Sequence, residues 1–207
     1  MSIEEIQELV RPNIRILSPY STARDEFDGR VGVFLDANES PYPSGWNRYP
    51  DPRQKNLKSM IASMLGVSIR EVFLGNGSDE AIDLIFRIFC TPGRDNVVAI
   101  SPSYGMYSVS ADINDVELRK VLLNADFSLP SDRILAACDN CTKAVFLCSP
   151  NNPTGNIFPR ETVCRLLEEF RGIVVVDEAY IDFSGGDGML QDIEKYHNLI
   201  ILRTFSK

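Results

Sequence analysis

Short apolar runs alternate with amphipathic segments over most of the chain from residue 70 onward. Strands that alternate with helices form a mostly parallel sheet covered on both faces, so the pattern predicts an α/β fold. The run at 173–176 is apolar without alternation, as expected of a strand buried on both faces. The apolar runs lie at Val72–Leu74, Val97–Ile100, Val116–Leu122, Ala144–Cys148, Ile173–Val176 and Leu199–Leu202. The helical patterns lie at Asp79–Phe89, Ser131–Ala137 and Arg160–Phe170.

The segment before residue 70 follows a less regular pattern. Ser2 and Glu5 have capping-box spacing, which predicts a short helix from residue 3. We expect an irregular arm over 11–30 and an ordered, proline-rich loop over Asn38–Pro52. A helix is predicted from Pro52 to Leu65, because proline suits a first helical turn and Gly66 suits a C-terminal stop. An apolar run at Val31–Leu35 could be a strand, and the apolar stripe of the predicted helix consists of Leu57, Ile61, Met64 and Leu65.

Composition and charge narrow the class of protein. The chain has 207 residues, of which 44% are hydrophobic and 24% charged, as is usual for a globular protein. Its net charge of −8 argues against a nucleic-acid partner, because such binding needs a basic face. The acidic start MSIEEIQELVRP is unlike a signal peptide, and no stretch approaches the length of a membrane span. We therefore expect a cytoplasmic protein without membrane association.

The five cysteines and the single histidine suggest no metal site. Cys138 and Cys141 form a C-x-x-C pair, but no second pair or histidine cluster follows. A redox role has little support, because the surrounding stretch CDNC lacks a thioredoxin-like context. We interpret the cysteines as reduced thiols and His197 as a structural residue.

Residues that could carry chemistry follow the apolar runs, where ligands of such sheets bind. After Leu74, the sequence GNGSDE could bring backbone amides and the Ser78 hydroxyl to an anion at a helix start, although it also fits an ordinary capped helix. Tyr104, after the next run, could stack on a planar ligand or be a core tyrosine. After Cys148, SPNNPTG is typical of a rigid turn that presents two side-chain amides.

The last two strand ends carry a carboxylate and a lysine. Asp177 ends a buried run, where a carboxylate is costly without a cationic partner. It indicates a charged ligand atom such as a protonated ring nitrogen, or else a cap for the next loop. Lys207 follows Thr204 and Ser206, and a lysine at a strand end can become nucleophilic when it loses water. Taken alone, it would be interpreted as a solvated surface lysine.

Taken together, these segments resemble fold-type-I pyridoxal-phosphate (PLP) aminotransferases. The matching segments are LSPY, LDANESPYP, NRYPDP, LGNGSDEAIDLI, SPSYGMYSVSA, CSPNNPTG, VVVDEAYIDF and LRTFSK. NRYPDP, YGMYSVSA and LRTFSK favour the histidinol-phosphate aminotransferase branch over aspartate or aromatic aminotransferases. The resemblance implies an α/β/α sandwich with a mostly parallel sheet, the large domain of a PLP transferase. Residues 1–50 would be an N-terminal arm and part of the small domain, and residues 51–207 a large domain that is incomplete at its C-terminal end.

The resemblance also implies roles for the matching residues. Lys207 would hold the PLP aldehyde as a Schiff base and shuttle a proton between substrate carbon and cofactor. Asp177 would keep the pyridinium nitrogen protonated. Tyr180, the third catalytic residue, and Asn152 would hydrogen-bond the ring hydroxyl. The remaining contacts would be Tyr104 on the ring face; Ser78, Asp79 (through its backbone amide), Thr204 and Ser206 at the phosphate; Tyr49 at the phosphate of a partner subunit's cofactor; and Tyr20 and Asn38 on the substrate side.

The function implied by the resemblance is transamination by a homodimer. Glutamate and 2-oxoglutarate would exchange nitrogen with imidazole-acetol phosphate and histidinol phosphate, in histidine biosynthesis. The chain stops at Lys207, before the arginines that grip phosphate and substrate in the family and before the small C-terminal domain. The gene product is then either longer than this chain or an inactive fragment.

Several alternatives stay open from the sequence. Aromatic aminotransferases and threonine-phosphate decarboxylases share several of these motifs. VVVDEA also resembles the strand end that holds magnesium in ATPases, but no Gly-x4-Gly-Lys-Ser/Thr loop accompanies it. A truncated relative that keeps the fold as a non-catalytic binding module is the last alternative.

Overall fold

The computed structural model describes residues 1–21, 33, 35, 37–186 and 188–207, which form two compact units. The larger unit joins Met1–Ile16 to Gly75–Lys207, and the smaller one spans Leu17–Leu74. Each unit is described by itself. The division predicted at residue 50 stays a prediction.

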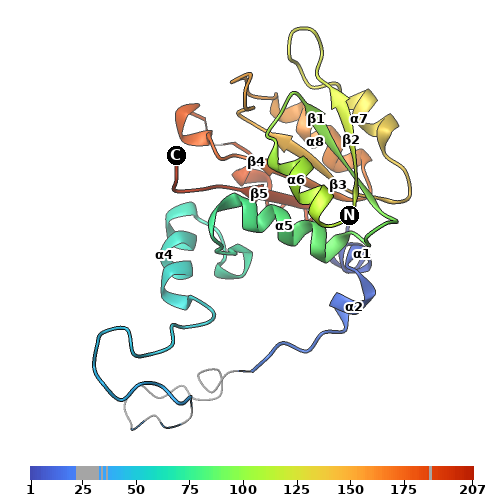
Figure 1. Ribbon diagram of the computed structural model, residues 1–207. Helices are drawn as coiled ribbons and strands as arrows, with labels where there is room; N and C mark the ends of the chain where they lie inside the picture. Colours follow the sequence, from blue (N-terminus) through green and yellow to red (C-terminus); the bar gives the residue numbers. More distant parts are fainter. Residues whose placement is uncertain (22–32, 34, 36, 187) are drawn as a thin grey trace. The chain divides into compact units, whose positions relative to one another are not determined.

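A five-stranded parallel sheet forms the centre of the larger unit (Figure 1). The spatial order is β2-β1-β3-β4-β5, so the chain reverses direction across the sheet between β1 and β3. Every strand confirms an apolar run of the sequence to within two residues at either end. The strands are β1 (Asn96–Ser101), β2 (Glu117–Leu122), β3 (Thr142–Cys148), β4 (Ile173–Asp177) and β5 (Leu199–Leu202).

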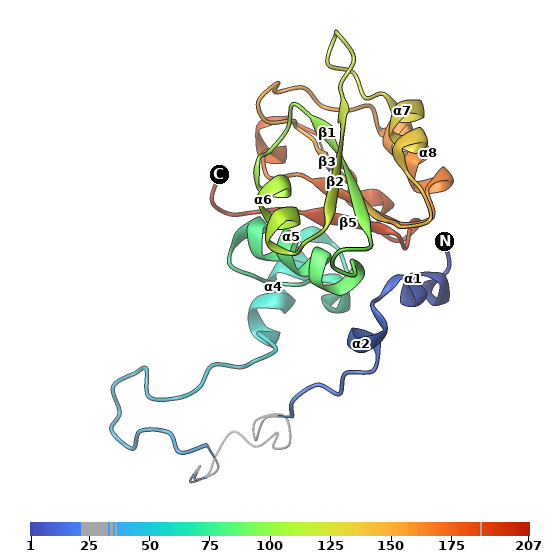
Figure 2. The same cartoon turned by 45° about the vertical axis from the view of Figure 1, so that its right-hand side comes forward.

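Helices cover both faces of this sheet, which confirms the predicted α/β/α layering. Figure 2 shows α5 and α6 on the side opposite to α7 and α8. Because side chains alternate along a strand, Val97 and Ala99 pack with α5 and α6, whereas Val98 and Ile100 pack with α7 and α8. The helices of this unit are α1 (Ile3–Leu9), α2 (Pro12–Arg15), α5 (Gly77–Phe89), α6 (Met106–Ile113), α7 (Ser131–Ala137) and α8 (Arg160–Glu169), with 3-10 turns η2 (Ile181–Phe183) and η3 (Leu190–Asp192).

The N-terminal capping box agrees with the sequence prediction, whereas one helix of the larger unit was not predicted. The capping box is present, since the Ser2 hydroxyl accepts from the Glu5 amide and the Glu5 carboxylate accepts from the Ser2 amide. The helix α6 was missed, although it carries the second tyrosine of YGMY. The arm predicted over 11–30 begins with a helical turn, α2, and its residues 22–30 lie outside the described residues.

The smaller unit contains α4 (Lys55–Leu65) and a 3-10 turn, η1 (Ile69–Glu71). The predicted start at Pro52 was wrong by one turn. The carboxylate of Asp51 accepts from the amides of Arg53 and Lys55, which forms a turn before the helix, and Gln54 takes a left-handed φ of 50°. The predicted end holds, because Gly66 follows with a φ of 70°.

The strand predicted at Val72–Leu74 was also wrong. These residues run without helix or strand between η1 and α5, and Phe73 is 58% exposed. A strand exists only where a neighbour exchanges backbone hydrogen bonds with it, and no described segment does so here. Val31–Leu35 falls largely outside the described residues, whereas the predicted loop at 38–52 has neither helix nor strand.

Candidate active site

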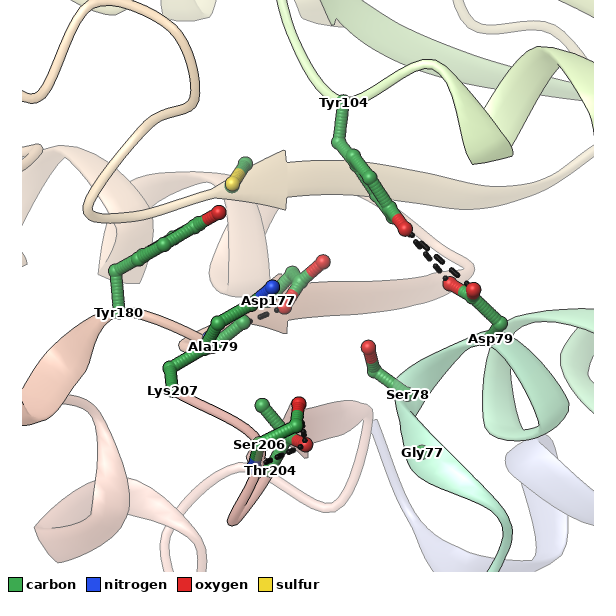
Figure 3. Close-up of a pocket in the computed structure, with 11 residues that line it drawn as sticks. Gly77, Ser78, Asp79, Tyr104, Asp177, Ala179, Tyr180, Thr204, Ser206 and Lys207 are labelled. Atoms are coloured by element: carbon green, nitrogen blue, oxygen red, sulfur yellow. Dashed lines mark hydrogen bonds between the residues drawn. The ribbon is translucent and has the colours of Figure 1, made fainter.

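A pocket opens at the carboxyl edge of the sheet, where the sequence placed its candidate residues (Figure 3). The reversal of strand order between β1 and β3 creates a crevice at that edge. Side chains from the ends of β1, β3, β4 and β5 meet there with the start of α5. The lining residues are Gly77, Ser78, Asp79, Tyr104, Cys148, Asp177, Ala179, Tyr180, Thr204, Ser206 and Lys207.

Asp177 is a buried carboxylate on the wall of this pocket. It ends β4, the second strand from the edge, and is 2% exposed. One carboxylate oxygen accepts from the Tyr107 hydroxyl at 2.8 Å, and the other from the Ala179 amide at 3.2 Å. Burial raises the pKa of Asp177, while these two hydrogen bonds act in the opposite direction.

In the part of the chain that the structure describes, no cationic side chain forms an ion pair with Asp177. A buried carboxylate is costly unless a cation compensates it. Because Asp177 lines an open pocket, the arrangement suits a ligand that brings a positive charge.

Tyr107 donates a hydrogen bond to Asp177 and was not predicted from the sequence as a site residue. Its ring is 1% exposed and stacks on Phe146, with ring centroids 5.1 Å apart. Burial, followed by the charge of Asp177, raises the pKa of the Tyr107 phenol, so its hydroxyl stays a donor. The sequence offered little signal for this role, because Tyr107 lies in α6, which had not been predicted, and Tyr104 precedes that helix.

Tyr104 forms the opposite wall and is tied to the start of α5. Its hydroxyl donates to the Asp79 carboxylate at 3.1 Å, and its ring meets Tyr107 edge-on at 5.7 Å. Burial and the Asp79 carboxylate raise the pKa of Tyr104 to about 12. The Asp79 carboxylate thus has a tyrosine hydroxyl as its donor, and an anion at the start of α5 would have to bind through backbone amides.

The start of α5 has the features of an anion site. Asn76 precedes the helix without a side-chain cap, and Gly77 and Ser78 both line the pocket. Uncapped amides and the helix dipole favour a negative group at this position. On the same side of the pocket as Ser78 in Figure 3, Thr204 and Ser206 present hydroxyls whose oxygens lie 2.8 Å apart.

Lys207 and Tyr180 complete the pocket. The Lys207 side chain extends into it from the end of β5, and its Nζ lies 5.5 Å from the centroid of the Tyr180 ring (Figure 3). Lys207 is exposed, so its amine is accessible. Cys148 was not singled out from the sequence as a pocket residue, although it ends β3; burial raises the pKa of its thiol to about 11.

The structure does not bring every predicted residue into this pocket. Asn152 is half-buried and is not among the lining residues, whereas its neighbour Asn151 is buried and bonds Ser103 and the Pro102 carbonyl. The roles of Tyr20, Asn38 and Tyr49 stay predictions, because these exposed residues belong to the smaller unit.

The remaining sequence predictions concern metals, thiols and membranes. The described residues contain no group of His, Cys, Asp and Glu side chains arranged to hold a metal ion. All five cysteines lie within the described ranges and are free thiols. His197 is exposed in the loop between η3 and β5. Among the described helices, none has the length and apolar character needed to cross a membrane.

Comparison with known proteins gives relatives over the whole chain. Over 206 residues, it is 58% identical to a histidinol-phosphate aminotransferase of Bacteroides fragilis, covering 99% of this chain and 60% of the relative. A Sinorhizobium meliloti histidinol-phosphate aminotransferase, solved with pyridoxal 5'-phosphate, is 29% identical with a TM-score of 0.70, over 83% of this chain and 51% of that one. An L-threonine-O-3-phosphate decarboxylase of Porphyromonas gingivalis is 25% identical with a TM-score of 0.63, over 77% and 49%.

The chain spans about 60% of the length of the curated relatives it matches. The family described as aminotransferase class I and II matches residues 34–207, which includes every lining residue of the pocket. This match and the parallel sheet agree with the resemblance seen in the sequence motifs. The chain belongs to the aminotransferase class I and II family.

Proposed function

We propose that the protein is a PLP-dependent aminotransferase that acts on histidinol phosphate. The observation that carries this proposal is a single pocket that holds both a buried carboxylate, Asp177, and an accessible lysine amine, Lys207. In the described residues Asp177 has no cationic partner, so a protonated ring nitrogen would compensate its charge.

The pocket residues fit the cofactor at both of its polar ends. The ring nitrogen would meet Asp177, and the phosphate would meet the start of α5, where Ser78 lines the pocket and the Gly77 amide donates to the Gly75 carbonyl. The hydroxyls of Thr204 and Ser206 face the same side. Tyr104 would lie on the ring face and Tyr180 would bond the ring hydroxyl, as would Asn152, although it is not a lining residue.

Each residue then has a distinct chemical task. When bound, PLP supplies an aldehyde that accepts the amino nitrogen and a ring that takes up the electron pair released when a proton leaves the substrate carbon. Asp177 would hold the proton on the ring nitrogen, and the Tyr107 hydroxyl would hold Asp177 in place. The Lys207 Nζ would carry the cofactor between turnovers and move the proton during them.

The choice of substrate rests on the relatives. Those at 58% and 56% identity are named histidinol-phosphate aminotransferases, and NRYPDP, YGMYSVSA and LRTFSK favour the same branch. The reaction would move nitrogen between glutamate and imidazole-acetol phosphate, giving 2-oxoglutarate and histidinol phosphate. We place this activity in histidine biosynthesis in the cytoplasm, where free thiols such as these persist.

We further propose that the active protein is a homodimer. Several aromatic side chains of the smaller unit are exposed, among them Tyr42 at 78%, Trp46 at 92% and Tyr49 at 68%. Large apolar side chains gathered on one segment are typical of an interface. Tyr49 would reach the phosphate of the partner's cofactor, and Tyr20 and Asn38 would line the substrate side. Replacing Tyr49 with Phe should weaken cofactor retention; unchanged retention would contradict this assignment.

The central test is reduction of the native full-length protein with borohydride, followed by peptide mapping. We expect a phosphopyridoxyl group on Lys207, lost in Lys207→Ala and retained in the control Lys195→Ala, whose lysine is exposed and does not line the pocket. A cofactor on another lysine, or none in the full-length protein, overturns the proposal.

A second candidate reaction is decarboxylation of threonine phosphate, which the similarity to the Porphyromonas gingivalis decarboxylase favours. The two reactions leave different products. Release of carbon dioxide from threonine phosphate, with no formation of 2-oxoglutarate from glutamate and imidazole-acetol phosphate, would favour the decarboxylase. Nitrogen transfer between glutamate and imidazole-acetol phosphate would favour the aminotransferase.

A further inference from the structure

A second buried carboxylate, Glu178, lies directly after Asp177 and does not line the pocket. It is 1% exposed, and both of its carboxylate oxygens are occupied. Oε2 accepts from Arg203 Nε at 2.9 Å and forms an ion pair with Arg203 Nη2 at 2.8 Å. Oε1 accepts from the Met189 amide at 2.6 Å. Glu178 therefore joins the ends of β4 and β5 to the loop before η3.

This pair needs an explanation beyond stability. Burial of an ion pair costs roughly as much as its attraction returns, and here the carboxylate is buried while the Arg203 side chain is 28% exposed. The ion pair between Glu178 and Arg203 instead fixes the positions of the segments that carry them. Glu178 is the residue after Asp177, and Arg203 lies four residues before Lys207 on the segment that carries the amine.

The pairing of β4 with β5 ends where Glu178 and Arg203 begin, with one last backbone hydrogen bond. The paired register ends at Asp177 opposite Leu202, and the Glu178 amide donates to the Leu202 carbonyl at 2.8 Å. Beyond Leu202, the Arg203 side chain carries the link between the two strands onward. The loop seals the other side of Glu178, because a Cβ placed on Gly188 would lie 2.2 Å from Glu178 Oε1.

We propose that Glu178 and Arg203 are positioning residues that fix the Lys207 segment against Asp177. This inference rests on the proposed function, since it assigns the pair to the distance between the carboxylate and the amine that would hold one cofactor. Loss of the ion pair frees the segment 203–207 to shift, and the amine then no longer meets the cofactor in the productive geometry.

The chain offers a matched control. Asp192 is also 1% exposed, and it accepts from Arg160 Nε at 2.7 Å. This pair joins α8 to η3, and neither residue lines the pocket. Asp192→Asn therefore breaks an ion pair of the same kind, between a buried carboxylate and a partly exposed arginine, without touching the strand ends.

The experiment compares Glu178→Gln with Asp192→Asn in the full-length protein loaded with PLP. We expect both variants to lower the midpoint of urea unfolding. Only Glu178→Gln should shift the pKa seen in the absorbance of the lysine-bound cofactor, and only it should lower kcat, on the order of 10- to 100-fold, with a smaller change in KM. Arg203→Lys should reproduce the shift of this absorbance pKa. It replaces Glu178→Gln as the test variant if Glu178→Gln does not fold.

An unchanged absorbance titration and kcat in the Glu178 and Arg203 variants would overturn the positioning role and leave a structural ion pair. Wild-type protein that takes no cofactor on Lys207 would instead overturn the proposed function, and this inference with it. The two failures are thus distinguished by whether the wild type or only the variants behave unexpectedly.

Discussion

The hydrogen bond from Tyr107 to Asp177 is the contact whose removal is most informative. Tyr107→Phe deletes the hydroxyl and keeps the ring, so the stacking on Phe146 at 5.1 Å is preserved. Asp177 then keeps only the Ala179 amide as a donor. The variant therefore removes the hydrogen bond to the buried carboxylate together with the contact between this hydroxyl and the Cys148 thiol.

The expected cost depends on the charge of Asp177. A hydrogen bond to a charged group contributes about 1.5–3 kcal/mol, and one between neutral groups about 0.5–1.5 kcal/mol. Burial raises the folded-state pKa of Asp177 above its unfolded value, so this residue lowers stability as pH rises through the folded pKa. Without Tyr107 that pKa rises further. The difference between wild type and variant should thus be about 1.5–3 kcal/mol at neutral pH and shrink as acid protonates Asp177.

Urea unfolding of the full-length apoprotein at several pH values measures this difference. Tyr196→Phe is the control, because Tyr196 is also buried and donates to Glu168 at 2.6 Å, but the Glu168 side chain is 58% exposed. We expect less than about 1 kcal/mol for the control, with little dependence on acid pH. Equal losses in the two variants, or a Tyr107→Phe loss that does not shrink in acid, would refute the reasoning.

Two further predictions test the packing around the pocket. Gly188→Ala should destabilise the protein by about 2 kcal/mol or more, because φ is 63° and the new Cβ would meet the Glu178 carboxylate. The control Gly185→Ala, at a φ of 68° in open space, should cost about 1 kcal/mol. Chemical denaturation of both variants measures the two losses. In the apoprotein near neutral pH, a thiol reagent should modify Cys141 before Cys90 and Cys148, because burial raises the pKa of Cys90 to about 12 and that of Cys148 to about 11. Mass spectrometry over a short time course measures the order. Earlier reaction of Cys90 or Cys148 would contradict the prediction.

The sheet was predictable because its strands are buried on both faces. A run of four apolar residues such as Ile173–Val176 is too short for a helix. As a strand with helices on both sides of the sheet, it is buried on both faces and therefore apolar at every position. The same logic failed at Val72–Leu74, where an apolar run meets no neighbouring strand. Apolar composition shows that a segment is able to form a strand. A strand forms only where a neighbouring segment pairs with it.

The site was predictable to the extent that it follows from strand ends. Asp177 and Lys207 end or follow apolar runs, and parallel strands bring such residues to one edge. Tyr107 could not be found in this way, because its role depends on a helix that has little apolar periodicity and on packing against Phe146. The contact between Glu178 and Arg203 depends on the register of β4 and β5, which no local pattern encodes.

The distribution of charge in the pocket restricts what can bind there. Asp177 supplies a buried negative charge, whereas the start of α5, with Gly77 and Ser78, supplies the positive end of a helix. The Asp79 carboxylate, which accepts from the Tyr104 hydroxyl, adds a negative charge beside that end, so an anion there would have to bind through backbone amides. This pocket would suit a ligand that is cationic near Asp177, anionic near the amides of α5 and able to react with the amine of Lys207. A phosphorylated pyridine aldehyde satisfies all three conditions, and an acidic protein with a net charge of −8 can hold it because the local field, rather than the total charge, acts on the phosphate.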